Sequence, residues 1–242
     1  MSQRRGSIED FDISNALRDI RRWYHIPTLV VLLAFMLWVR VRGWENFYRD
    51  GQVLLSGNDA WYHLRQTTYT VKHWPQTMPF DPWTYFAYGT SQSQFGTLFD
   101  QLMATAALIV GLGDPSQQTI TATVLFAPAV FGTLVAIPVY FAGKRLGGRF
   151  GGLVSVLVLA LSTGGFLQRS LVGFSDHQVG EALFQMIAVV GIMVALSVAQ
   201  KERPVWELVV NREWDALRNP LGWSALAGVG IGVYLWIWPP GV

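Results

Sequence analysis

The sequence predicts an all-α integral membrane protein, a polytopic helix bundle of about five spans. Of its 242 residues, 51% are hydrophobic and only 14% are charged, and 11 are tryptophan. A soluble domain of this composition would struggle to stay in solution, whereas a lipid bilayer accommodates it. A helix needs about 20 mostly apolar residues to cross a bilayer. The stretches that meet this requirement are 26–43, 119–141, 149–168, 180–199 and 221–239.

A sixth apolar stretch, 98–112, is shorter and carries the polar residues Asp100 and Gln101 near its start. An aspartate near the bilayer centre costs about 2.5–3.5 kcal/mol on insertion scales. With five spans and a cytoplasmic N-terminus, 12 of the 18 lysines and arginines lie inside, as the positive-inside rule requires. A sixth span would instead place the basic loop 143–149 outside. We therefore expect 98–112 to form an interfacial or re-entrant helix.

This topology divides the chain into four parts. A cytoplasmic amphipathic segment, 1–25, precedes the first span, 26–43. Residues 44–118 form a long external loop that contains the interfacial helix, and 119–242 hold spans two to five with short connecting loops. The protein is then a multi-pass protein of the cell membrane, with Asp59 and Asp176 on its external face.

Charge and cysteine content limit the chemistry. The basic residues are scattered in loops beside the helices, so the net charge of +2 reflects topology and predicts no nucleic-acid partner. The chain contains no cysteine, so oxygen or imidazole must bind any metal ion. Asp59 and Asp176 supply the hard carboxylate oxygens that Mn²⁺ and Mg²⁺ prefer. On spacing alone, two separately solvated interfacial acids remain the ordinary alternative.

Four motifs, in order, resemble the oligosaccharyltransferase catalytic subunit, in particular its archaeal AglB type (dolichyl-phosphooligosaccharide-protein glycotransferase). The resemblance runs through essentially the whole chain and includes a Trp-rich, Pro-containing end of the fifth span, 235–240. The four motifs are GNDAWYHLR at 57–65, FDPWTYFAYGT at 80–90, GTLFD at 96–100 and RSLVGFSDHQ at 169–178.

The resemblance implies a transmembrane domain of the GT-C glycosyltransferase type. It also implies a metal-dependent, inverting transfer of a glycan from a dolichyl phosphate or pyrophosphate carrier to Asn of Asn-X-Ser/Thr sequons. The implied partners are the lipid-linked oligosaccharide, the acceptor protein and the membrane, with Mn²⁺ or Mg²⁺ as cofactor. We expect a single-subunit enzyme.

The resemblance also assigns residues. Asp59 matches the acid that binds the metal and hydrogen-bonds the acceptor amide, Asp176 matches the second metal ligand, and Arg169 matches an arginine near these acids. Gln178 stands where the family usually has a carboxylate or histidine, so direct, water-mediated or absent coordination all remain open for its amide oxygen. Arg169 also fits a snorkelling interfacial arginine. Supporting roles around the metal are expected for His177, His63 and Glu181.

The chain covers only the N-terminal part of the family. It ends at Val242, whereas the family continues with further spans, another catalytic acid and a sequon-binding domain, so we expect these residues alone to be inactive. One alternative is another lipid-carrier glycosyltransferase, such as a protein O-mannosyltransferase, but those place an Asp-Glu pair where this chain has Asp59-Ala60. The other alternative is a non-enzymatic transporter or assembly subunit, which would carry polar residues along its spans.

Overall fold

The computed structural model describes residues 23–49, 51–91, 95–199 and 204–241, and this part of the chain is mostly helical. The expected N-terminal amphipathic segment 1–25 lies almost entirely outside it. Two short antiparallel strand pairs, Tyr48–Arg49 with Gln52–Val53 (β1, β2) and Phe80–Asp81 with Thr90–Ser91 (β3, β4), interrupt the helices. The helices are α2 (His25–Val41), η1 (Trp44–Phe47), α3 (Gly57–His73), α4 (Leu98–Val110), α5 (Gln117–Leu134), α6 (Ala136–Leu161), α7 (Gly165–Arg169), α8 (Gln178–Ala199), α9 (Val205–Val210), α10 (Trp214–Ile237) and η3 (Pro239–Gly241).

Within the described residues, four helical segments are long and apolar enough to cross a membrane: His25–Phe47, Gln117–Leu161, Gln178–Ala199 and Trp214–Ile237. The second contains 45 residues and joins α5 to α6. It does not run straight, because α6 reverses at Gly147 and Gly148. The two halves of this segment therefore stand where the sequence predicts the second and third spans.

Glycine permits both the reversal of α6 and the close packing of its halves. Gly148 has φ +65° and ψ −164°, a backbone conformation that residues other than glycine rarely adopt. A Cβ atom at Gly143 would lie 2.2 Å from Ser155 Oγ and 2.8 Å from the carbonyl oxygen of Gly151. Small residues let the helix backbones approach, as is common where helices pack inside membranes.

The third expected span, 149–168, ends earlier than its apolar residues indicate. α6 stops at Leu161, and α7 begins only at Gly165. The break contains Gly164, whose φ of +102° cannot continue a helix. A hydropathy pattern does not reveal such a break, because Phe166 and Leu167 are apolar whether or not the helix continues through them.

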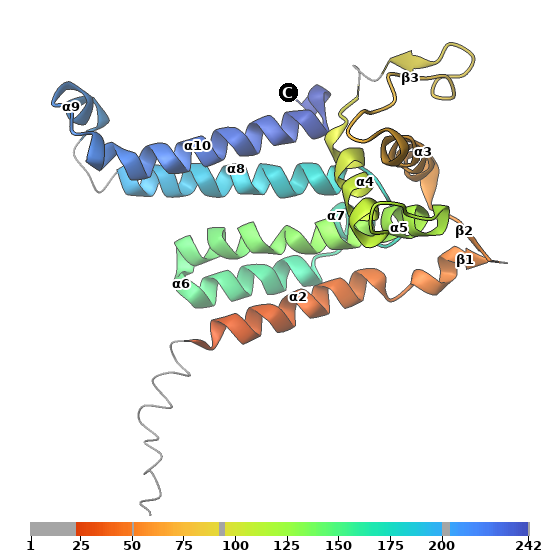
Figure 1. Cartoon of the computed structure of the whole chain (residues 1–242). Coiled ribbons are helices and arrows are strands. Elements are labelled where there is room, and N and C mark those ends of the chain that lie inside the picture. The colour runs from red at the N-terminus through yellow and green to blue at the C-terminus, as the bar shows by residue number, and fades with distance from the viewer. Residues whose placement is uncertain (1–22, 50, 92–94, 200–203, 242) are drawn as a thin grey trace, which may run out of the picture.

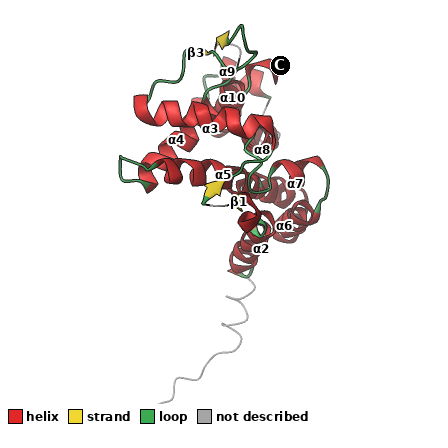
Figure 2. Cartoon of the chain, turned by 90° about the vertical axis from the view of Figure 1, so that its right-hand side faces the viewer, coloured by secondary structure: helices red, strands yellow, loops and turns green. Residues whose placement is uncertain are grey.

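The helices form a bundle with one elaborated end. α2, α6, α8 and α10 lie side by side, while α3, α4 and the strands gather at the end away from α9 and from the reversal of α6 (Figure 1). Seen from the elaborated end, α3, α4 and α5 lie in front of the long helices (Figure 2). A buried apolar cluster ties these elements together; it includes Ala60, Phe99, Val124, Val172 and Ile237.

Candidate catalytic and metal site

The two acidic motifs meet at the elaborated end of the bundle. Asp59 lies in the first turn of α3, and Asp176 lies in the loop that leads to α8. The backbone N–H of Ser56 donates to the carbonyl oxygen of Gly173 at 3.0 Å, so a hydrogen bond joins the two motif segments directly. Both aspartates line one cavity of about 1060 Å³.

All seven residues singled out in the sequence line this cavity: Asp59, His63, Arg169, Asp176, His177, Gln178 and Glu181. They differ in burial. Asp176 and His63 are buried, whereas Asp59 and Gln178 are exposed to the cavity. The cavity therefore has a buried inner wall and an exposed outer one, and the roles of the individual residues remain predictions.

Asp176 is held from several sides. Arg169 Nη1 donates to Asp176 Oδ2 at 2.5 Å, and the preceding Ser175 hydroxyl donates to the carbonyl oxygen of Val124 in α5. Burial alone raises the pKa of Asp176, but the imidazoles of His177 and His63, together with Arg169, hold it below its usual range. These contacts hold Asp176 in place and favour its ionised form.

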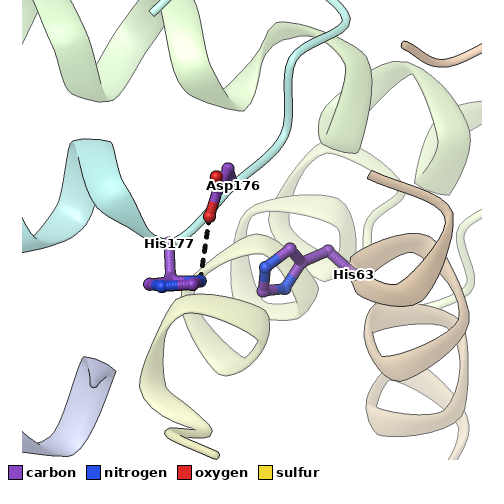
Figure 3. A group of neighbouring side chains, drawn as sticks. All are labelled: His63, Asp176 and His177. Atoms are coloured by element: carbon purple, nitrogen blue, oxygen red, sulfur yellow. Dashed lines mark ion pairs between the residues drawn. The ribbon is translucent and has the colours of Figure 1, made fainter. Parts of the chain in front are cut away.

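Oδ1 of Asp176 is buried and forms an ion pair with His177, whose Nδ1 lies 2.9 Å away. A buried carboxylate oxygen beside a ring nitrogen is a donor pair that fits a divalent metal ion. His63, Asp176 and His177 each present one such atom, all within 4.8 Å of one another (Figure 3).

His63 forms a buried pair that the sequence did not reveal. Its Nδ1 lies 2.7 Å from Oδ1 of Asp100 in α4, and both side chains are buried. Burial raises the pKa of the Asp100 carboxyl. Burial alone lowers the pKa of His63, but the charge and hydrogen bond of Asp100 raise it overall. In the sequence, Asp100 is notable as an obstacle to membrane insertion and as the end of the motif at 96–100, and its separation of 37 positions from His63 hides the contact.

His177 is oriented by two neighbours. Its ring stacks on Trp238, with ring centroids 4.0 Å apart and planes inclined by 15°. Its Nε2 lies 3.3 Å from Oε1 of Glu181, one turn into α8. Trp238 follows the end of α10, so the Trp-rich end of the fifth span contributes directly to the cavity wall.

The motif at 80–90 builds another wall. Arg65 donates to Asp81, which also accepts from the Thr84 hydroxyl at 2.7 Å and the Trp83 backbone N–H at 3.0 Å. Although burial alone raises the pKa of Asp81, these donors hold it below its usual range. Arg65, Trp83 and Thr84 all line the cavity. The cavity thus combines two guanidinium groups with carboxylates and aromatic rings.

This fold and cavity define a class: a polytopic helical membrane protein with a polar, acid-bearing cavity at one end of its bundle. The family model described as "Oligosaccharyl transferase STT3, N-terminal" matches residues 29–242. The chain therefore belongs to the STT3 oligosaccharyltransferase family.

Two curated relatives agree with this assignment. The chain is 59% identical over 222 residues to the Dolichyl-monophosphooligosaccharide–protein glycotransferase AglB of Haloferax volcanii. It is 28% identical over 229 residues to the Dolichyl-phosphooligosaccharide-protein glycotransferase 3 of Archaeoglobus fulgidus. These matches cover 92% and 95% of this chain but only 21% and 25% of the relatives, so the chain spans about a quarter of their length or less.

Solved structures show the same fold. The AglB oligosaccharyltransferase from Archaeoglobus fulgidus, in complex with an inhibitory peptide and a dolichol-phosphate, matches with a TM-score of 0.76 and 27% identity. That match covers 90% of this chain and 24% of the other. The Archaeoglobus fulgidus enzyme in complex with Zn and sulfate matches with a TM-score of 0.73 and 28% identity, over 87% of this chain and 25% of the other. The predicted fold class is confirmed.

Proposed function

We propose that this chain contributes the membrane part of an oligosaccharyltransferase active site. The enzyme transfers a glycan, with inversion, from a dolichyl phosphate or pyrophosphate carrier to the side-chain amide of Asn in Asn-X-Ser/Thr sequons. One observation carries the proposal: Asp59 and Asp176, separated by 117 positions in the sequence, line one cavity and are joined through the bond between Ser56 and Gly173. Family membership favours this reaction over O-mannosyl transfer or a transport role.

Each residue then has a stated task. Asp176 and Asp59 supply carboxylates to a Mn²⁺ or Mg²⁺ ion, and Arg169 orients Asp176 by donating to it. The exposed carboxylate of Asp59 accepts a hydrogen bond from the acceptor amide, which weakens conjugation of the amide nitrogen with its carbonyl. Gln178 adds a neutral amide oxygen at the rim. The ion, when bound, supplies positive charge that stabilises the departing lipid phosphate.

The proposal is tested in the full-length enzyme with its lipid-linked glycan, a sequon peptide and Mn²⁺. Asp59→Ala and Asp176→Ala should each abolish peptide glycosylation, and Gln178→Ala should reduce it less. Asp114→Ala serves as a matched control, because Asp114 is an exposed acid that does not line the cavity. Wild-type transfer by either Asp59→Ala or Asp176→Ala would exclude the shared-metal mechanism.

We further propose that the cavity faces the outside of the cell and that the N-terminus is cytoplasmic. The basic residues Lys144, Arg145 and Arg149 flank the reversal of α6, at the end of the bundle away from the cavity (Figure 1). Single cysteines test this orientation in a full-length protein without other cysteines. An impermeant thiol reagent added to intact cells should label position 58 but not position 146; the reverse pattern would invert the topology.

A further inference from the structure

We propose that an apolar groove between α6 and α8 binds an anionic membrane lipid, with the lipid chain in the groove and the acidic headgroup on Lys144 and Arg145. The groove has a volume of about 600 Å³ and shares no lining residue with the catalytic cavity. Lipid binding here is separate from glycan transfer, and the proposed orientation of the bundle serves only to name the leaflet.

Apolar side chains at helical spacing form the walls of the groove. All of its lining residues except Lys144 and Arg145 are apolar. The stripe that α8 contributes is Leu183, Ile187, Val190 and Val194, whose spacing of three or four residues places them on one face of the helix. Leu183 and Val190 are 8% exposed, whereas Phe141 on the α6 side is 49% exposed. The groove therefore has a covered floor and an open side.

The length of the groove matches one leaflet of a bilayer. Leu183 and Val194 are 11 positions apart on α8, which corresponds to about 16 Å at about 1.5 Å per residue. The hydrocarbon core of a bilayer is about 30 Å thick, so one leaflet contributes about 15 Å. A lipid chain that lies along α8 thus fits the groove within a single leaflet. A groove for a membrane-spanning helix would continue for about twice that length.

Two cations close one end of the groove. Lys144 and Arg145 are exposed and directly precede the reversal of α6 at Gly147 and Gly148. Within the described part of the chain, neither has a carboxylate at ion-pair distance. Lys144 Nζ lies 5.8 Å from the centroid of the Phe141 ring, which lines the same groove. This cation–π contact keeps the ammonium group beside the apolar wall.

An apolar groove that ends in two cations fits a ligand with an apolar chain and an anionic head. Basic pockets between membrane helices on the cytoplasmic side bind the headgroups of anionic lipids in this way. The reversal of α6 lies at the end of the bundle away from the catalytic cavity, which is the cytoplasmic end in the proposed orientation (Figure 1). The proposed glycan carrier has to place its phosphate at the opposite end. The lipid in the groove is therefore distinct from the reacting carrier.

Photocrosslinking of the full-length enzyme in liposomes tests the groove without any substitution. The probe is phosphatidylglycerol with a diazirine in its chain, and phosphatidylcholine with the same chain is the neutral comparison. We expect phosphatidylglycerol to label peptides from 183–194 and 137–141 more strongly than phosphatidylcholine does. Peptides from 154–161 are the control, because this part of α6 carries exposed apolar side chains outside the groove and both lipids should label it equally.

Two outcomes of this experiment would overturn the inference. If neither lipid labels 183–194 while both label 154–161, another part of the full-length chain fills the groove. If both lipids label 183–194 equally, the cations do not select an anionic headgroup.

Substitution of the cations tests the headgroup contact. Lys144→Gln combined with Arg145→Gln should lower the preference for phosphatidylglycerol over phosphatidylcholine by about fivefold for each cation, or about 30-fold for the pair. Titrations followed by native mass spectrometry of the full-length enzyme measure the two dissociation constants. Arg149→Gln combined with Arg218→Gln is the matched control, because it removes the same charge from exposed residues that do not line the groove.

An unchanged lipid preference in Lys144→Gln/Arg145→Gln, or an equal loss in the control, would overturn the inference. Peptide glycosylation by the same preparations reports separately on the proposed function, since none of these four residues lines the catalytic cavity. Lost lipid preference with glycan transfer retained supports both proposals. Lipid preference without glycan transfer in the wild type would leave the groove in place and count against the proposed function alone.

Discussion

Replacing Gly173 by alanine probes the backbone contact that brings the two acidic motifs together. Gly173 has φ +85°, a left-handed conformation that costs other residues about 1–2 kcal/mol. Its Cβ atom would lie 2.2 Å from the ring of Phe47, a contact so short that the ring or the loop must move. Overpacking of this kind costs about 1–3 kcal/mol. The two effects together amount to about 2–5 kcal/mol, concentrated next to Asp176.

The loop relieves this strain most easily by moving Gly173 away from Phe47, which breaks the bond from the Ser56 N–H. A displacement of about 1 Å at an active site commonly costs about 100-fold in rate. We therefore expect Gly173→Ala to lower peptide glycosylation by the full-length enzyme about 100-fold and to lower its thermal midpoint. Gly222→Ala is the control, since its Cβ would meet nothing within 4 Å. Wild-type rate and thermal midpoint in Gly173→Ala would refute the reasoning.

Three further predictions address the fold, the cavity wall and the ion. Gly148→Ala should destabilise the protein by about 1–3 kcal/mol through backbone strain alone. Gly147→Ala should not, because Gly147 has a negative φ and its Cβ atom would meet nothing within 4 Å. Equal thermal midpoints for the two variants would contradict this prediction. Asp81→Asn should lower the thermal midpoint near neutral pH, by about 1–3 kcal/mol in stability. The folded pKa of Asp81 lies below its ordinary value. The stability difference between wild type and Asp81→Asn should therefore persist above about pH 4 and shrink as the pH falls through the lowered pKa. A stability difference that stays constant down to pH 3 would exclude the effect. Chelation of divalent ions should abolish glycan transfer, and added Mn²⁺ should restore it. Mn²⁺ at 100 times its Kd should stabilise the wild type by about 2.7 kcal/mol and should not stabilise Asp176→Ala.

Local patterns sufficed for much of the architecture. Apolar length predicted membrane helices, and charge bias demoted 98–112, which contains α4, a helix of 13 residues. The motif acids Asp59 and Asp176 could be assigned to the same face of the membrane, because they follow the first and third expected spans, which cross the membrane in the same direction. Hydropathy could not locate the end of α6, since the break depends on the backbone conformation of Gly164 rather than on polarity.

Contacts between distant side chains could not be predicted in the same way. His63 was expected to support the metal, but no pattern identifies Asp100 as its partner, because the choice depends on how α4 crosses α3. The pairing of Arg65 with Asp81 likewise requires the β3–β4 hairpin to fold over α3. In both cases a charged residue in an otherwise apolar or aromatic segment was the available signal. Such a residue must find a partner when it is buried, although the sequence does not say which.

The two motif acids differ in how far each is open to the cavity. Asp176 is buried, with Arg169 donating to Oδ2 and His177 Nδ1 lying 2.9 Å from Oδ1. Asp59 is exposed in the first turn of α3 and lines the same cavity. An acceptor that enters from the cavity reaches an exposed carboxylate more easily than a buried one that its neighbours already hold. We therefore propose that Asp59 is the acid that meets the acceptor and that Asp176 is the acid that anchors the ion.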